Sequence, residues 1–132
     1  MEMTRDQWER LIAHAREQEP NECCGYLKLR DGVVEEVFSA DNDRGSPYGY
    51  SLGFEALMAA NELDDEGFEV GIYHSHPRSN AIPSQTDVNL AQYPTWRQLI
   101  VSLLGDEARE GPPIRCYWIA EGKYEEESID VG

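Results

Sequence analysis

Residues 72–77, with the sequence IYHSHP, constrain the fold of this chain more than any other stretch. The preceding residues 70–73 are apolar and β-prone apart from one glycine, so we expect a buried strand over about residues 69–75. Strand side chains alternate between faces, and His74 and His76 therefore point to the same side. Pro77 ends the strand because it cannot donate to a sheet ladder. The sequence thus predicts two imidazoles together at the end of a central strand.

Seven residues separate His76 from a second motif, Ser84-Gln85-Thr86-Asp87. Ser84 is expected to open a helix and to place Asp87 in its first turn. Two imidazoles and a carboxylate form the ligand set of a catalytic zinc ion, Zn²⁺, with a fourth position left to water. Each fragment also has an ordinary explanation, because Ser-x-x-Asp is a helix capping box and His-x-His pairs often only decorate surfaces. Their combination, with Pro77 and this spacing, is more specific than either.

The combined motif resembles that of the JAMM (MPN+) metallopeptidases. That family also places a glutamate on an early strand in a Glu-x-Cys-Gly context, and this chain has Glu22-Cys23-Cys24-Gly25. The match runs from about Gln18 to the end, and it is strongest to short bacterial members that act on ubiquitin-like sulfur carrier proteins. The resemblance implies one α/β domain over residues 1–132, with a curved, mixed, largely antiparallel sheet flanked by helices.

That fold is broadly like the cytidine deaminases, which also use zinc and a glutamate. The deaminases require His-x-Glu and Pro-Cys-x-x-Cys motifs. The chain has no Cys-x-x-Cys, so a deaminase is excluded.

Hydrolysis of a peptide or isopeptide bond at such a zinc site needs a base and a donor to the developing oxyanion. Glu22 is the candidate base, which takes a proton from water and returns it to the leaving amine. The Ser84 hydroxyl is the candidate donor. Ser84 has no third histidine to activate it as a nucleophile, and Asp87 as the base would leave the zinc one ligand short. Cys24 should face the same side as Glu22 and pack there without binding metal.

The resemblance implies cleavage after the C-terminal glycine of a ubiquitin-like sulfur carrier, with release of cysteine or a short extension. Residues 40–50 and 78–83 are polar loops that should wall a groove for an extended Gly-Gly tail. Residues 93–96 leave no room for the second insertion of the eukaryotic deubiquitinases. Two alternatives stay open: a zinc hydrolase of a small amide or cell-wall-type peptide, and a non-catalytic MPN scaffold. Scaffold members lack the ligands that are present here.

The composition of the chain limits the classes of binding partner and the cellular compartments that we expect for the protein. The 132 residues suit one domain with one core, and 26 acidic against 11 basic residues give a charge of -15 that opposes nucleic acid. No run is long enough to span a membrane and the N-terminus is charged, so we expect a cytoplasmic protein. Three cysteines do not form a disulfide framework. A homodimer is left open.

The remaining pattern alternates helices and strands. In the second helix we expect Phe54, Leu57 and Met58 to face inward, whereas His14 in the first helix should be solvated and without a role. Helices are predicted over residues 4–18, from 51 or 53 to 65, and 84–92; further strands are predicted over 25–29, 33–38, 98–104, 114–120 and 124–129.

Overall fold

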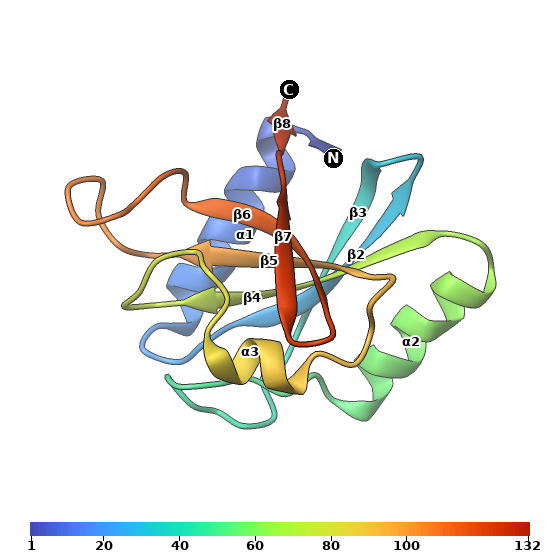
Figure 1. Cartoon of the computed structure of the whole chain (residues 1–132), viewed down its shortest axis with the longest axis horizontal. Coiled ribbons are helices and arrows are strands. Elements are labelled where there is room, and N and C mark those ends of the chain that lie inside the picture. Colours follow the sequence, from blue (N-terminus) through green and yellow to red (C-terminus); the bar gives the residue numbers. More distant parts are fainter.

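The computed structural model describes residues 1–132 and contains three helices and eight strands (Figure 1). None of its helices combines the length and the apolar character that crossing a bilayer requires. In chain order the elements are β1 (Glu2–Met3), α1 (Arg5–Gln18), β2 (Cys24–Arg30), β3 (Val33–Ala40), α2 (Phe54–Asp65), β4 (Glu69–His76), α3 (Gln85–Leu90), β5 (Arg97–Ser102), β6 (Ile114–Ala120), β7 (Lys123–Glu127) and β8 (Asp130–Val131).

All eight strands form one sheet in the order β7-β6-β5-β4-β2-β3-β1-β8. Among the long strands only β4 and β5 run parallel, while β2–β3, β2–β4, β5–β6 and β6–β7 are antiparallel. β7 and β8 are neighbours in sequence but lie at opposite ends of this order, so the sheet has to curl. The amino group of Met1 contacts a carboxylate oxygen of Glu127 at 2.7 Å across the closing edges. The predicted curved, mixed and largely antiparallel sheet is therefore confirmed.

Helices cover both faces of the sheet, and β4 lies buried between them. On one face α1 contributes Leu11 and Ala15 to a core that includes Tyr73 of β4. On the other face α2 packs against Ile72, and α3 packs over β5 and β6. Alternation along β4 therefore sends Tyr73 toward α1 and Ile72, with the two histidines, toward α2 and α3.

Two hairpins form as the sequence predicts. Asp31 and Gly32 join β2 to β3, and Glu121 and Gly122 join β6 to β7, each residue with a positive φ between 50° and 78°. Two successive left-handed residues are typical of the type I′ turn that matches strand twist. No sequence pattern indicates the two-residue strands β1 and β8, which form where the chain termini meet at the sheet edge.

Three details of the helices differ from the prediction. Leu57 of α2 faces inward as predicted, whereas Phe54 and Met58 are exposed, and Ala60 and Leu63 complete the buried side. Residue spacing alone does not determine which side of this helix packs on the sheet. In the structure the side with the smaller side chains packs there. α3 ends at Leu90 rather than at about residue 92, because Ala91 already has an extended conformation.

His14 was expected to be solvated, and this was wrong. It is partly buried, and its Nδ1 lies 2.8 Å from the hydroxyl of Tyr73. Burial lowers its pKa despite the neighbouring carboxylates. The pair ties α1 to the central strand on the face opposite the site.

Candidate metal centre

Three side chains from β4 and α3 converge on one point. The Nε2 atoms of His74 and His76 are 3.2 Å apart, His74 Nε2 lies 3.3 Å from Asp87 Oδ1, and His76 Nε2 lies 3.1 Å from Asp87 Oδ2. The structure thus brings together the three residues that the sequence predicts as ligands. His74 and His76 are buried, and Asp87 is largely covered.

The spacing of these donor atoms fits a tetrahedral zinc ion. Zinc binds imidazole nitrogen and carboxylate oxygen at about 2.0–2.2 Å, and tetrahedral geometry then separates neighbouring donors by roughly 3.3–3.5 Å. The three observed separations of 3.1–3.3 Å lie close to that value. Three such donors leave one tetrahedral position for water or substrate, which is the pattern of a catalytic site rather than a structural one.

Hydrogen bonds around the cluster orient its donor atoms. His76 Nδ1 lies 2.8 Å from the carbonyl oxygen of Asn80, so this nitrogen donates and Nε2 keeps its lone pair. The ring of Tyr50 stacks on His74, with ring centroids 4.4 Å apart. The Ser84 backbone N–H donates to Asp87 Oδ2 at 2.9 Å, and the Asp87 N–H donates to Ser84 Oγ at 3.0 Å. The capping box therefore orients one of the candidate ligands.

The pKa shifts of His74 and Asp87 favour the neutral ring and the charged carboxylate that a metal binds. Burial lowers the pKa of His74, which favours the neutral ring. Burial acts the same way on His76, but the contacts with Asp87 and Asn80 outweigh it and raise its pKa. Burial acts to raise the pKa of Asp87, yet its contacts with both histidines outweigh burial and hold the pKa far below the usual range. The carboxylate is therefore charged at any physiological pH.

Glu22 lies next to this cluster, directly before β2. Its side chain is buried, and its Oε1 has no hydrogen-bond partner in the protein. Burial, partly opposed by His76, raises the pKa of Glu22 to about 7. Its backbone is held on both sides, because its N–H donates to the Ser46 carbonyl at 2.9 Å and its carbonyl accepts from Asn42 Nδ2 at 2.9 Å. A fixed, poorly solvated carboxylate is suited to proton transfer near neutrality.

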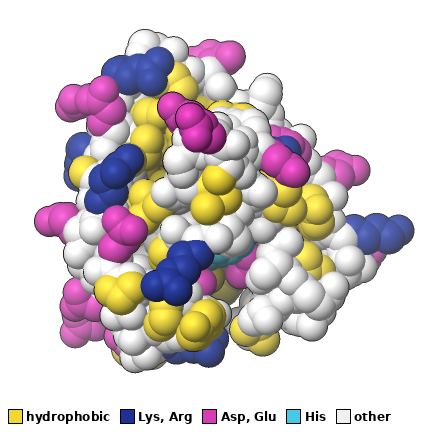
Figure 2. Space-filling view, turned by 90° about the vertical axis from the view of Figure 1, so that its left-hand side faces the viewer, with side chains coloured by type: hydrophobic (Ala, Val, Ile, Leu, Met, Phe, Trp, Pro, Cys, Tyr) yellow, Lys and Arg dark blue, Asp and Glu magenta, His cyan; other side chains and the backbone are white.

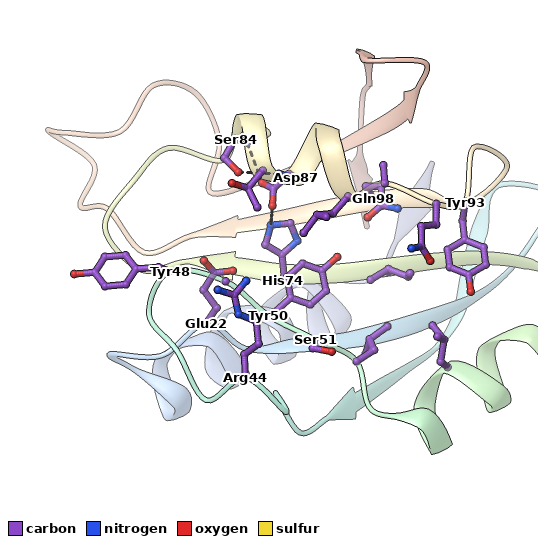
Figure 3. Close-up of a pocket in the computed structure, with 18 residues that line it drawn as sticks. Glu22, Arg44, Tyr48, Tyr50, Ser51, His74, Ser84, Asp87, Tyr93 and Gln98 are labelled. Atoms are coloured by element: carbon purple, nitrogen blue, oxygen red, sulfur yellow. Dashed lines mark hydrogen bonds and ion pairs between the residues drawn. The ribbon is translucent and has the colours of Figure 1, made fainter.

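A groove of about 390 Å³ runs past these residues (Figure 3). In space-filling view, histidine surface is visible at the bottom of a hollow, with acidic and hydrophobic side chains around it (Figure 2). One wall is the loop between β3 and α2, as expected. The other wall was predicted wrongly: residues 78–83 do not line the groove, and Leu90, Gln92 and Tyr93 do. α3 ends early enough for the chain after it to pass over the opening.

Sequence reasoning missed several residues of the site. Asn42 binds the loop to Glu22, Tyr50 covers His74, and Arg44 and Gln98 line the groove. The run Asn42-Asp43-Arg44-Gly45 carried a turn signal, but its spatial neighbours could not be read from the sequence.

The three cysteines are buried free thiols. Cys23 belongs to the core under α1, and Cys24 Sγ lies 3.5 Å from the Asp41 carbonyl. Burial raises the pKa of Cys24 to about 12 and that of Cys23 to about 11. Neither thiol belongs to the three-residue metal cluster. Ser75 lies behind the site and accepts a hydrogen bond there from the Cys23 N–H at 2.8 Å.

Comparison with known proteins identifies the family. The sequence pattern of the family described as prokaryotic homologs of the JAB domain matches residues 4–120. The chain belongs to this family, which confirms the resemblance to JAMM proteins.

Among its relatives is a CysO-cysteine peptidase of Mycobacterium tuberculosis. It is 35% identical over 125 residues, which cover 92% of this chain and 84% of that protein. A desampylase of Haloferax volcanii is 33% identical over 129 residues, covering 83% of this chain and 92% of the relative. A solution structure from Desulfitobacterium hafniense has 35% identity and a TM-score of 0.82, with 99% of this chain and 92% of that chain covered.

We expect His76→Ala to lose most bound zinc, because only two ligands remain. Cys24→Ala is the matched control at a neighbouring buried position and should keep a stoichiometric ion. The measurement is zinc per protein by mass spectrometry after dialysis, with folding checked by circular dichroism. Full zinc in His76→Ala, or half or less in Cys24→Ala, would show the ligand assignment to be wrong.

Glu22 should make the metal-free protein less stable as pH rises. Its pKa is raised from 4.5 to about 7, so the folded state prefers the protonated form. That stabilisation is complete below pH 4.5 and is lost as pH rises through 7. Glu22→Gln mimics the neutral carboxyl, so its free energy of unfolding relative to wild type should increase between pH 5 and 8.

The measurement is urea unfolding in chelator at both pH values. Glu9→Gln, at an exposed position on α1, is the control and should change stability equally at both. A pH-independent difference for Glu22→Gln would contradict the raised pKa.

Proposed function

We propose that this protein is a zinc-dependent peptidase that cleaves after the C-terminal glycine of a ubiquitin-like sulfur carrier protein. The observation that carries the proposal is the convergence of His74, His76 and Asp87 at zinc spacing beside the unpartnered carboxylate of Glu22. Scaffold proteins need neither feature, so the scaffold alternative loses its support. Family membership supports the same assignment.

Each side chain then has a distinct task. A zinc ion held by His74, His76 and Asp87 would polarise the scissile carbonyl and lower the pKa of a bound water to about 7. Glu22 takes the proton of the attacking water and returns it to the leaving nitrogen. The raised pKa of Glu22 in the metal-free protein suits a group that must both accept and release a proton, and a nearby cation would lower it.

Ser84 supplies a hydrogen bond to the developing oxyanion. Its Oγ accepts from the Asp87 N–H at 3.0 Å, which leaves the hydroxyl proton free to point into the groove. The cap fixes where this hydroxyl sits, so the structural and catalytic tasks of Ser84 are compatible. A preorganised donor of this kind typically contributes about 10²–10³-fold in kcat.

The groove and the relatives support a protein tail as substrate. An extended Gly-Gly segment has no side chains and fits between Tyr50 on one wall and Leu90 on the other. The relatives named CysO-cysteine peptidase and desampylase act, by those names, on protein conjugates. A volume of about 390 Å³ also lies in the range of small-ligand sites, so size alone does not exclude a small amide.

Glu22→Gln should keep the fold and the bound zinc but lose most turnover. A positioned base contributes about 10²–10⁴-fold, so kcat should fall within that range. The assay follows mass loss of a carrier–cysteine adduct, and zinc content is measured on the same samples. Near-normal kcat with full zinc would assign the base to another group.

A short peptide that copies only the carrier tail should be cleaved far less efficiently than the intact adduct. The groove holds a few residues, so most affinity must come from the folded body of the carrier. The comparison is kcat/KM for both substrates at low and high salt. Equal values would favour the small-amide hydrolase instead. A ratio that shrinks with salt would show that the charge of -15 attracts a basic carrier surface.

A further inference from the structure

Arg44 is the only arginine or lysine among the 18 residues that line the groove. Arg44 and Glu22 line the same groove (Figure 3) without forming an ion pair, and the charge of Arg44 acts to lower the Glu22 pKa. Basic residues are scarce in this chain, and those engaged in ion pairs are Lys28, Arg30, Arg97, Arg109 and Arg115. Arg44 is not among them, so its guanidinium is available to pair with an anion in the groove.

The loop holds this charge in a fixed relation to Glu22. Asn42 Oδ1 accepts from the Arg44 N–H at 3.0 Å, and Asn42 Nδ2 donates to the carbonyls of Glu22 at 2.9 Å and Gly49 at 3.0 Å. The guanidinium packs over Gly49, where an added Cβ would lie 2.7 Å from Arg44 Cζ. One asparagine therefore connects the backbone of the base with that of the arginine, and a glycine leaves room for the guanidinium.

We propose that Arg44 binds the free α-carboxylate of the residue that leaves, and that the enzyme therefore releases a single C-terminal amino acid. The inference rests on the proposed function. In an amino acid the carboxyl carbon is two bonds from the nitrogen, about 2.5 Å away. Glu22 must reach that nitrogen to protonate it, so the carboxylate of the leaving residue lies within a few ångströms of Glu22. Arg44 places its guanidinium in that region, and guanidinium matches carboxylate in a bidentate pair.

Other leaving groups offer no such anion. When an isopeptide bond is cleaved, the leaving nitrogen is the side-chain amine of a lysine. The backbone carbonyl of that lysine is separated from this nitrogen by the whole side chain. A longer peptide extension carries a neutral amide where a terminal residue carries its carboxylate. Either leaving group would shield the Arg44 guanidinium from water without supplying a negative charge to pair with it, which is unfavourable in a partly desolvated groove. Arg44 therefore selects for a terminal residue such as cysteine and against isopeptide bonds.

The test gives the zinc-loaded enzyme two adducts of one carrier, each extended by cysteine, with either a free carboxylate or a carboxamide at the end. Wild type should favour the acid by ~10- to 100-fold in kcat/KM, as expected for a charged hydrogen-bonded pair. Arg44→Gln should lose this preference by slowing only the acid. Arg78→Gln removes the same charge from an exposed position outside the groove and should keep the preference.

A second variant moves the guanidinium without removing its charge. Gly49→Ala places a methyl group where the Arg44 head group packs, and the end of a flexible side chain can shift at little cost to the fold. The acid preference should fall in Gly49→Ala. Gly105→Ala, where an added Cβ meets nothing within 4 Å, should keep it.

Binding gives a readout separate from turnover. In the Glu22→Gln background the acid adduct should bind ~10-fold or more tightly than the amide by calorimetry, and Arg44→Gln should abolish the difference. Equal kcat/KM of wild type on acid and amide would overturn the role of Arg44 while leaving the peptidase assignment intact. An equal loss on both substrates in Arg44→Gln would also overturn it, since the arginine would then act only through Glu22. Hydrolysis of neither adduct by wild type would overturn the proposed function itself.

Discussion

The register between β2 and β4 determines where the chemistry of this protein can occur. Cys24 pairs with His74 in that ladder, and the backbone pairing continues through a bond of 3.1 Å from the Ser75 N–H to the Cys23 carbonyl. Because the strands are antiparallel, β2 begins beside the end of β4. Glu22, which precedes β2, therefore lies at the same end of these strands as the two histidines. A slip by one residue would turn both histidines into the core under α1.

The loop between β3 and α2 completes this arrangement. Asn42 and Ser46 hold the Glu22 backbone from both sides, and the same loop brings Tyr50 onto His74 and Arg44 to the groove. A buried carboxylate without a hydrogen-bond partner is unfavourable, and it persists because the loop fixes it there. The position of the base, the access to the cluster and the proposed carboxylate binding therefore depend on one irregular segment.

The sequence predicted the features that depend on short-range spacing. His74, His76, Ser84 and Asp87 lie within one strand, one turn and the first turn of one helix, so their convergence follows from local geometry. Glu22 was found only through the family resemblance, because its nearness to the histidines arises from strand pairing across 50 residues of chain.

The features that the sequence did not predict depend on long-range packing. The inward side of α2, the tyrosine contact of His14 and the wall formed by Leu90 and Tyr93 are decided by neighbouring elements.

Zinc K-edge X-ray absorption of the loaded protein tests the central claim most directly. The account predicts nitrogen and oxygen ligands at about 2.0–2.2 Å, with an imidazole signal from two histidines. Sulfur at about 2.3 Å, or a spectrum without the imidazole signal, would contradict it.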